Sequence, residues 1–260
     1  MNLGGRLAVL TGATGKIGHV MARTLAELGA DLLLLDRPAS PFGQLKEEIA
    51  PFSRGAIDFL PCDLEDGAQR QAVVSALLAS RRPVSVLVNN AAFVGSSDLQ
   101  GWALPFAEQR VDTWRRAIEV NLTAVFDLCQ GLLPLLQAAP GASVVNIGSI
   151  YGMLGPDWAL YAGTTMANPA AYAASKGGLL QLTRWLATTL APAVRVNAIS
   201  PGGVWRGQPE SFIDKYEART PLGRMAGEED FAGALAYLAS DLSSYVTGQN
   251  LVVDGGWTAW

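Results

Sequence analysis

Short apolar runs alternate with longer segments of helical periodicity along the whole chain. The runs are rich in Val, Ile and Leu, and they cover residues 7–10, 31–35, 57–60, 84–88, 144–147, 194–199 and 251–253. Strands that are apolar on both faces are typical of a parallel sheet covered by helices on both sides. The alternation therefore predicts an α/β fold: a Rossmann-type doubly wound parallel sheet, formed as a single domain over residues 1–260.

Three loop-rich stretches follow predicted strands, at residues 93–105, 151–169 and 202–227. The carboxyl ends of parallel strands meet at one edge of the sheet, and ligands of such folds bind there. We therefore expect all three stretches to lie beside one common binding site.

The first predicted strand runs into a glycine-containing turn, with Gly12, Gly15 and Gly18 around Lys16 and Ile17. A segment of helical spacing at residues 20–28 follows it. Glycines in this position allow a tight turn and a close approach of a pyrophosphate, which the amino end of the next helix attracts. Glycines also serve ordinary turns, so this triplet alone is weak support for a dinucleotide site.

The second predicted strand ends at Asp36, which stands 18 residues after Gly18. A carboxylate there can accept hydrogen bonds from the adenosine ribose hydroxyls and repels a 2'-phosphate. This favours NAD as the cofactor. Lys16 and Arg37 lie nearby in the sequence and could attract a 2'-phosphate, so NADP is the less favoured alternative.

Tyr172 and Lys176 stand at the head of an apolar helical segment after the fifth predicted strand. Residues four apart share one face of a helix, so the phenol and the ammonium point into the same cleft. A nearby cation lowers the pKa of a phenol and makes proton transfer to a substrate oxygen feasible. Tyr151 and Tyr161 have no cation four residues later, so neither is a candidate for this role.

Two further polar residues are candidates for the same site. Ser149 follows the apolar run at 144–147, where a hydroxyl can stabilise charge on a reacting oxygen, although a helix or turn cap is the alternative interpretation. Asn121 lies in the middle of a predicted helix, where asparagine is a mediocre helix former. His19 is the sole histidine, and Cys62 and Cys129 lie far apart, so no metal site and no disulfide are predicted.

These motifs, in this order, resemble the short-chain dehydrogenase/reductase family from one end of the chain to the other. The resemblance implies that Tyr172 is the general acid and base, that Lys176 tunes it and binds the nicotinamide ribose, that Ser149 binds the substrate oxygen, and that Asn121 supports a water-linked proton path. The implied cofactor contacts are Gly12, Gly15, Lys16, Ile17, Gly18, Asp36, Asp63, Leu64, Asn90, Ala91, Tyr172, Lys176, Pro201, Gly202 and Val204.

The chain also departs from the family pattern. Ser149 and Tyr172 are 23 residues apart, a longer separation than the family commonly shows, so residues 151–169 are interpreted as an inserted active-site loop. Its Trp158, Tyr161, Met166 and Asn168 could contact a sugar or a neighbouring subunit, and both interpretations stay open. Residues 203–224 resemble the substrate loop, in which Arg206, Arg219 or Arg224 could pair with an acidic substrate or lie at the surface.

Charge and hydropathy exclude other classes of partner. The net charge is -4 without a basic stripe, which argues against nucleic acid. The apolar runs are far shorter than the roughly 20 residues that span a membrane, and the start of the chain lacks the features of a signal peptide. We expect a cytoplasmic enzyme with a small-molecule substrate, and the resemblance implies a homotetramer.

The predicted function is reversible hydride transfer between NAD and a secondary alcohol or ketone. The inserted loop favours a sugar, a polyol or a sugar derivative, and the chain resembles the branch of the family associated with sugar and flagellin modification. A 3-oxoacyl thioester reductase that uses NADPH is the alternative within enzymes, and Asp36 counts against it. A regulator that binds NAD without turnover is the alternative outside them.

Overall fold

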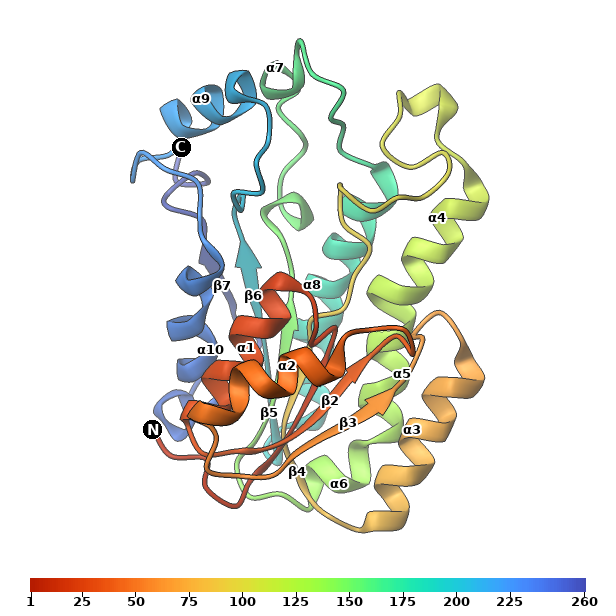
Figure 1. Cartoon of the computed structure of the whole chain (residues 1–260), viewed down its shortest axis with the longest axis vertical. Helices are drawn as coiled ribbons and strands as arrows, with labels where there is room; N and C mark the ends of the chain where they lie inside the picture. The colour runs from red at the N-terminus through yellow and green to blue at the C-terminus, as the bar shows by residue number, and fades with distance from the viewer.

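The computed structural model describes residues 1–260 and contains one parallel sheet of seven strands (Figure 1). The order of the strands in the sheet is β3-β2-β1-β4-β5-β6-β7. Their bounds are β1 Leu7–Thr11, β2 Asp31–Asp36, β3 Ile57–Pro61, β4 Val84–Asn89, β5 Ala142–Ile147, β6 Val194–Pro201 and β7 Asn250–Val253. The order reverses between β1 and β4, as in the predicted Rossmann-type fold, which is confirmed.

Helices cover both faces of the sheet. Their bounds are α1 Lys16–Glu27, α2 Phe42–Ile49, α3 Gly67–Ser80, α4 Val111–Ile118, α5 Ala124–Gly131, α6 Leu133–Gln137, α7 Trp158–Tyr161, α8 Ala170–Leu190, α9 Glu210–Arg219 and α10 Ala232–Ala239. One apolar core joins the sheet to α3, α5, α6 and α8, and a second joins its other face to α1, α2 and α10. The predicted strands are therefore apolar on both sides because both sides are covered.

The first helix begins earlier than its periodicity predicts. The apolar spacing indicated residues 20–28, whereas α1 starts at Lys16, directly after the glycine turn. In the first turn of α1, Lys16 is exposed and polar and Gly18 has no side chain, so the apolar pattern is weak there. The earlier start brings the amino end of α1 up to the glycines.

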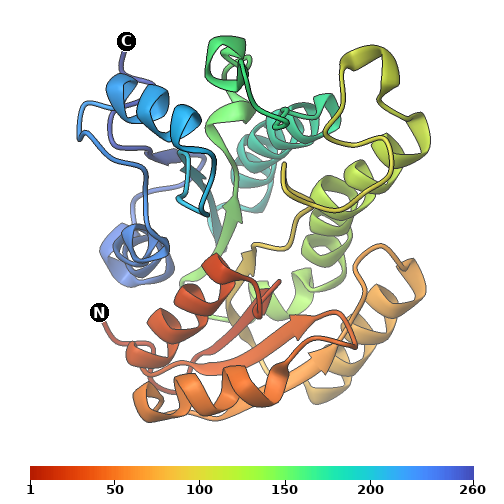
Figure 2. The same ribbon diagram turned by 45° about the horizontal axis from the view of Figure 1, so that its top comes forward.

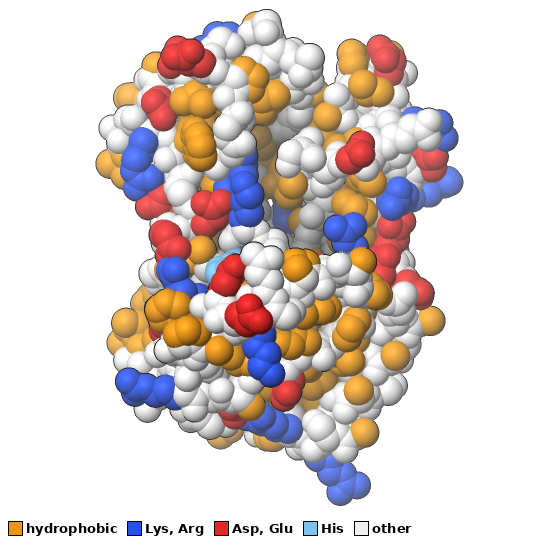
Figure 3. Space-filling model, viewed as in Figure 1, with side chains coloured by type: hydrophobic (Ala, Val, Ile, Leu, Met, Phe, Trp, Pro, Cys, Tyr) orange, Lys and Arg blue, Asp and Glu red, His pale blue; other side chains and the backbone are white.

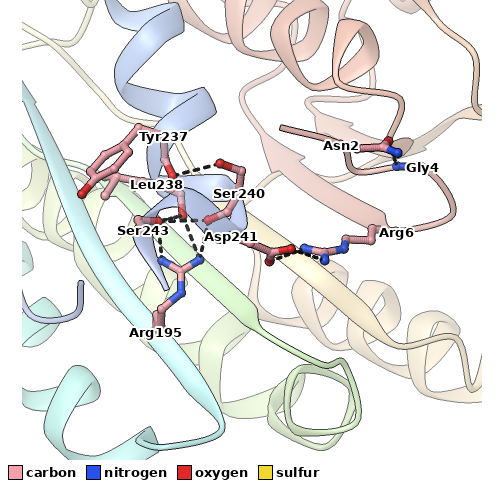
Figure 4. A network of polar contacts seen from close by, with 9 residues as sticks. All are labelled: Asn2, Gly4, Arg6, Arg195, Tyr237, Leu238, Ser240, Asp241 and Ser243. Carbon is pink, nitrogen blue, oxygen red and sulfur yellow. Dashed lines mark hydrogen bonds and ion pairs between the residues drawn. The ribbon is translucent and has the colours of Figure 1, made fainter. Parts of the chain in front are cut away.

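Polar contacts fasten the amino ends of the strands, at the edge of the sheet opposite the predicted site. Arg195, on β6, donates hydrogen bonds of 2.7 Å to Ser243 Oγ and 3.2 Å to the carbonyls of Leu238 and Ser240 (Figure 4). Arg6, just before β1, pairs with Asp241 at 2.7 Å. The segment after α10 is thereby tied to both strands.

The cysteines and the apolar residues of the helices lie as follows in the structure. Cys62 and Cys129 are buried and free, and burial raises the pKa of their thiols to about 11 and about 12. None of the helices combines the length and the apolar character that crossing a membrane requires. Leu179 and Leu186 of α8 are packed in the core.

The loops at the carboxyl ends of the strands form the upper part of the molecule. Figure 2 shows α7 and α9 together on one side of this region and the segment before α4 on the other. Figure 3 shows the surface hollowed between these segments above and α1 with α2 below. The hollow lies at the edge of the sheet where the predicted site residues follow their strands.

Candidate active site

The three residues of the predicted proton-transfer group converge at the end of β5. Ser149 follows this strand directly, and Tyr172 and Lys176 come from the first two turns of α8. Lys176 is buried and donates a hydrogen bond of 2.6 Å to the carbonyl of Ile147, the last residue of β5. Its Nζ lies 5.9 Å from the centre of the Tyr172 ring. The helical spacing thus places the phenol and the ammonium on one face, as predicted.

Burial, and not the lysine, has the largest effect on the phenol of Tyr172. It raises the pKa of Tyr172 above its ordinary value, and a hydrogen bond with Ser149 offsets part of this rise. Burial therefore outweighs any effect of the ammonium on the pKa of Tyr172, and the lowering of this pKa by the ammonium together with a bound nicotinamide stays a prediction. The Tyr172 phenol and the Lys176 ammonium are both removed from water. The ammonium lies over the Tyr172 ring and donates a hydrogen bond to the Ile147 carbonyl. The same burial lowers the pKa of Lys176 to about 8.

Asn121 does not lie in an ordinary helix. It occupies a π-helical segment, Glu119–Thr123, between α4 and α5, which corrects the expectation of an α-helix. Its Oδ1 accepts a 2.7 Å hydrogen bond from the Phe93 amide, and its Nδ2 donates to Phe93 O and Ser175 Oγ, each at 3.0 Å. The side chain is thus fully used in joining the loop after β4 to α8. The predicted proton path through this residue stays a prediction.

The glycine turn is packed closely against neighbouring backbone, which leaves no space for a Cβ at Gly12 or Gly18. Gly12 has a φ of +66°, and a Cβ there would lie 2.8 Å from Ala91 Cα. A Cβ on Gly18 would lie 2.0 Å from the carbonyl oxygen of Gly12. Larger residues cannot occupy these positions without moving the backbone. Lys16 and Ile17 begin α1, and their amides make no hydrogen bond to the protein. They remain available for a phosphate group.

Asp36 is tied to the same turn. Its Oδ2 accepts hydrogen bonds from the Thr14 amide at 2.9 Å and from Thr14 Oγ1 at 2.8 Å, and its Oδ1 accepts one from Ser40 Oγ at 2.9 Å. The side chain is half-buried. Asp36 therefore holds the glycine turn against the end of β2, in addition to its predicted contact with a ribose.

Asparagine side chains hold neighbouring strand ends together. Asn90 donates from Nδ2 to the carbonyls of Thr11 and Gly12, at 3.1 and 3.0 Å. Asn89 donates to Asn146 Oδ1 at 2.8 Å, and Asn146 donates to Thr183 Oγ1 on α8 at 2.9 Å. Asn146 and Thr183 were missed, although an asparagine inside the apolar run 144–147 is a visible signal.

The other predicted cofactor residues also lie at the carboxyl ends of strands. Asp63 accepts a hydrogen bond of 3.0 Å from the Glu65 amide through Oδ1, and Leu64 beside it is buried. Pro201 ends β6, and Val204 pairs with Ala226 in an isolated bridge. The structure places these residues around one edge of the sheet, and their contacts with a cofactor remain predictions.

Tyr216 of α9 packs on the backbone that follows β6. A Cβ on Gly203 would lie 2.5 Å from the Tyr216 ring, and the Gly203 amide donates a hydrogen bond to the Tyr216 hydroxyl. A bulky phenol is therefore packed directly on the backbone that follows Gly202. Sequence reasoning missed this contact because it joins residues thirteen positions apart.

Residues 151–169, the predicted inserted loop, pack on residues 203–224, the predicted substrate loop. Arg219 of α9 pairs with Asp157 at 2.6 Å, and Lys215 donates to the carbonyls of Ala159 and Ala162, each at 3.0 Å. Leu160 and Tyr161 share an apolar cluster with Phe212 and Tyr216. One side of residues 151–169 therefore covers α9 of the same chain.

The three arginines of the substrate loop each have a carboxylate partner within the chain. Arg219 pairs with Asp157, Arg224 pairs with Asp230 at 2.7 Å, and Arg206 pairs with Glu228. Burial lowers the pKa of Arg206. These pairs favour a structural role over recognition of an acidic substrate.

Comparison with known proteins agrees with this geometry. A family model described as enoyl-(acyl carrier protein) reductase matches residues 12–258. The chain belongs to the short-chain dehydrogenase/reductase family. It is similar over its full length to enzymes that act on CH–OH groups, and it is an oxidoreductase of that kind.

Three relatives are similar to this chain over nearly its whole length. The cis-4-hydroxycyclohexanecarboxylate dehydrogenase of Sinomonas cyclohexanicum is 35% identical, over 98% of this chain and 97% of the relative. The galactitol 2-dehydrogenase (L-tagatose-forming) of Cereibacter sphaeroides is 34% identical, over 99% and 97%. The 3-oxoacyl-[acyl-carrier-protein] reductase of Thermotoga maritima is 32% identical, over 98% and 99%.

Solved structures share the fold over their full length. A gluconate 5-dehydrogenase from Burkholderia cenocepacia, in complex with NADP and tartrate, has a TM-score of 0.86 at 29% identity and covers 100% of this chain and 97% of its own. A short-chain dehydrogenase from Leptospira borgpetersenii with bound NAD+ has a TM-score of 0.85 at 30% identity, over 99% and 94%. Similar proteins thus bind either nicotinamide cofactor.

Proposed function

We propose that this protein is an NAD-dependent dehydrogenase that interconverts a secondary alcohol and a ketone on a sugar, a polyol or a sugar derivative. One observation carries the proposal: Ser149, Tyr172 and Lys176 meet at the end of β5, at the same edge of the sheet as the glycine turn. Proton transfer and cofactor binding are thereby available at one place.

The residues around the glycine turn fit a dinucleotide. The amides that open α1 are free of protein partners, and the contacts of Gly12 and Gly18 leave no space for a side chain. Lys16, Ile17 and Gly15 would hold the pyrophosphate, Asp36 the adenosine ribose, Asp63 with Leu64 the adenine, and Lys176 the nicotinamide ribose. The bound nicotinamide supplies or accepts the hydride.

NAD is proposed over NADP because of the negative charge at the end of β2. The Asp36 carboxylate would repel a 2'-phosphate and accept hydrogen bonds from ribose hydroxyls. A comparison of kcat/KM for NADH and NADPH tests this, and we expect a clear preference for NADH that Asp36→Ala reduces. A preference for NADPH in the unaltered protein contradicts the assignment.

The chain's own residues divide the proton chemistry among them. In the oxidation direction, Tyr172 takes the proton of the substrate hydroxyl, while Ser149 donates a hydrogen bond to the reacting oxygen. Lys176 holds a positive charge beside the phenol. Asn121 fixes the helix that carries Tyr172 through its bond to Ser175.

A screen of NAD reduction against polyols, sugars, sugar acids and 3-hydroxyacyl thioesters tests the substrate class, with Tyr172→Phe as the control. The galactitol-oxidising and gluconate-oxidising relatives support the first three classes. The thioester is the second candidate, supported by the 3-oxoacyl reductase at 32% identity. Turnover of the thioester alone would replace the proposed substrate class, and binding of NADH without turnover of any compound would revive the regulator.

We also propose a cytoplasmic homotetramer. Val111 and Trp114 of α4 and Phe126 of α5 leave apolar side chains exposed, as does Trp185 of α8. Exposed apolar surface of this kind is typical of subunit contacts. Light scattering of the purified protein tests the assembly, and a mass that matches one chain contradicts it.

A further inference from the structure

Two phenols and an amide form a polar cluster beside Tyr172 that the proposed proton chemistry does not use. Tyr151 lies two residues after Ser149, Tyr161 ends α7, and Asn168 stands four residues before Tyr172. Tyr151 Oη and Tyr161 Oη are 2.7 Å apart. The Tyr151 amide donates a hydrogen bond of 3.2 Å to Ser149 Oγ, so the cluster borders the predicted proton-transfer group.

The cluster is fixed in position by its neighbours. Tyr151 belongs to the short helix Ile150–Gly152, where a Cβ on Gly152 would lie 2.8 Å from the Lys176 carbonyl oxygen. Tyr161 packs on Phe212 of α9, with ring centres 5.4 Å apart. The two phenols are therefore held by α8 on one side and by α9 on the other.

Burial favours the neutral form of both phenols. Burial raises the pKa of Tyr151 and of Tyr161 above their ordinary values. Two hydroxyls that share one hydrogen bond keep one proton for another acceptor. The pair can therefore donate one hydrogen bond to a further oxygen.

Asn168 is incompletely bonded although it is buried. Its side chain lies near both phenols, and its Oδ1 is buried without any partner in the protein. The residue is only 6% exposed. A buried acceptor without a donor costs free energy, which a ligand hydroxyl at this point would recover.

We propose that Tyr151, Tyr161 and Asn168 form a recognition site for a second, uncharged hydroxyl of the substrate, close to the carbon that exchanges hydride. The inference rests on the proposed function and narrows its substrate class to neutral polyols and ketoses. The cluster offers donors and an acceptor, which match the two hydrogen-bonding roles of a hydroxyl. Arg206, Arg219 and Arg224 are already paired, so the substrate loop offers no free arginine for a carboxylate.

The test compares a neutral polyol with a secondary alcohol that has one hydroxyl, such as cyclohexanol, in the unaltered enzyme and three variants. Asn168→Leu, Tyr151→Phe and Tyr161→Phe should each lower kcat/KM for the polyol by about 10- to 100-fold, mainly through KM. The value for cyclohexanol should change less than about threefold. Tyr245→Phe is the matched control, since Tyr245 is fully exposed.

Thermal unfolding and the Kd for NADH show whether each variant still folds and binds its cofactor. Equal losses for both alcohols mean that the cluster is structural and overturn the site, as does an aldonate that outcompetes the neutral polyol in the unaltered enzyme. If the unaltered enzyme oxidises cyclohexanol as well as it oxidises polyols, hydride transfer stands and the hydroxyl site fails. Inactivity on every compound of the panel overturns both proposals.

Discussion

The two halves of the cleft are held in shape by different forces. Around the glycine turn, backbone touches backbone, and a Cβ on Gly18 would lie 2.0 Å from the Gly12 carbonyl oxygen. Across the cleft, residues 151–169, the predicted inserted loop, and residues 203–224, the predicted substrate loop, are joined by side chains: an ion pair, lysine hydrogen bonds and packed aromatic rings. Close backbone packing tolerates few substitutions, whereas side-chain contacts can be exchanged without loss of the fold.

This difference implies a division of roles. A rigid half suits a cofactor that is the same in every turnover, and an adaptable half suits a substrate that differs between relatives. We call the region of the glycine turn the cofactor half, and residues 151–169 with residues 203–224 the substrate half. Substitutions in the cofactor half should therefore cause large losses of activity, and substitutions in the substrate half should change activity by smaller amounts.

Loss of the Tyr172 hydroxyl should have the largest effect, because this residue serves both halves. We expect Tyr172→Phe to lower kcat by about 10²- to 10⁴-fold, the range typical of a lost general acid and base. The Kd for NADH should change little, since the ring remains. Single-turnover kinetics with fluorescence titration of NADH measure both quantities. A kcat within a fewfold of the original value would remove Tyr172 from the proton transfer.

The buried ammonium of Lys176 should make stability depend on pH. Burial lowers the pKa of Lys176 from 10.5 to about 8, so the unfolded chain binds more protons between these two values. The free energy of unfolding should therefore rise from pH 8 to pH 10.5, with a contribution on the order of 3 kcal/mol. Below pH 8 both states carry the charge, and the cost of burying it is fully present.

Urea unfolding of the original protein and of Lys176→Met at several pH values isolates this contribution, because other titrating groups are common to both. The difference in unfolding free energy between the two proteins should increase from pH 8 to pH 10.5. A constant difference would mean that Lys176 keeps its ordinary pKa in the folded protein.

The cofactor half was the more predictable half from sequence. Alternating apolar runs located every strand to within about two residues, since β propensity and burial act locally. The glycine spacing and the four-residue spacing of Tyr172 and Lys176 placed both groups at one edge of the sheet. These features are encoded by residues that are near one another in the chain.

The substrate half depended on contacts that local patterns do not contain. Asp157 and Arg219 are 62 positions apart, and nothing in either segment specifies the pairing. Tyr151 and Tyr161 were set aside because neither has a cation four residues later, whereas their actual partners are each other. The π-helical segment at Asn121 was read as an α-helix because one added residue per turn barely changes an apolar pattern.

A matched pair of glycine substitutions tests how tightly the cofactor half is packed. Gly18→Ala should raise the Kd for NADH by at least about tenfold, because the added methyl group displaces the Gly12 carbonyl. Gly43→Ala adds the same methyl group to α2, where a Cβ meets nothing within 4 Å, and should stabilise that helix by about 0.5–1 kcal/mol. Isothermal titration calorimetry measures the Kd for NADH, and thermal unfolding measures the change in stability. Unchanged NADH affinity in Gly18→Ala would show that the glycine turn can adapt.

The Asp157–Arg219 pair should have the smallest effect, and its size decides whether the substrate half is adjustable. Both side chains are about one-third exposed, so solvent screens the pair, and a double-mutant cycle of Asp157→Asn with Arg219→Gln should give a coupling of about 0.2–1 kcal/mol in unfolding free energy. Arg219 also lies 4.3 Å from the Trp257 ring centre, so Arg219→Gln alone should cost more than Asp157→Asn alone. Substrate KM should rise a fewfold while the Kd for NADH stays constant, because the pair fastens α7 to α9 and touches nothing at the glycine turn. If the Kd for NADH changes in step with KM, the two halves move as one body and the proposed division of roles is wrong.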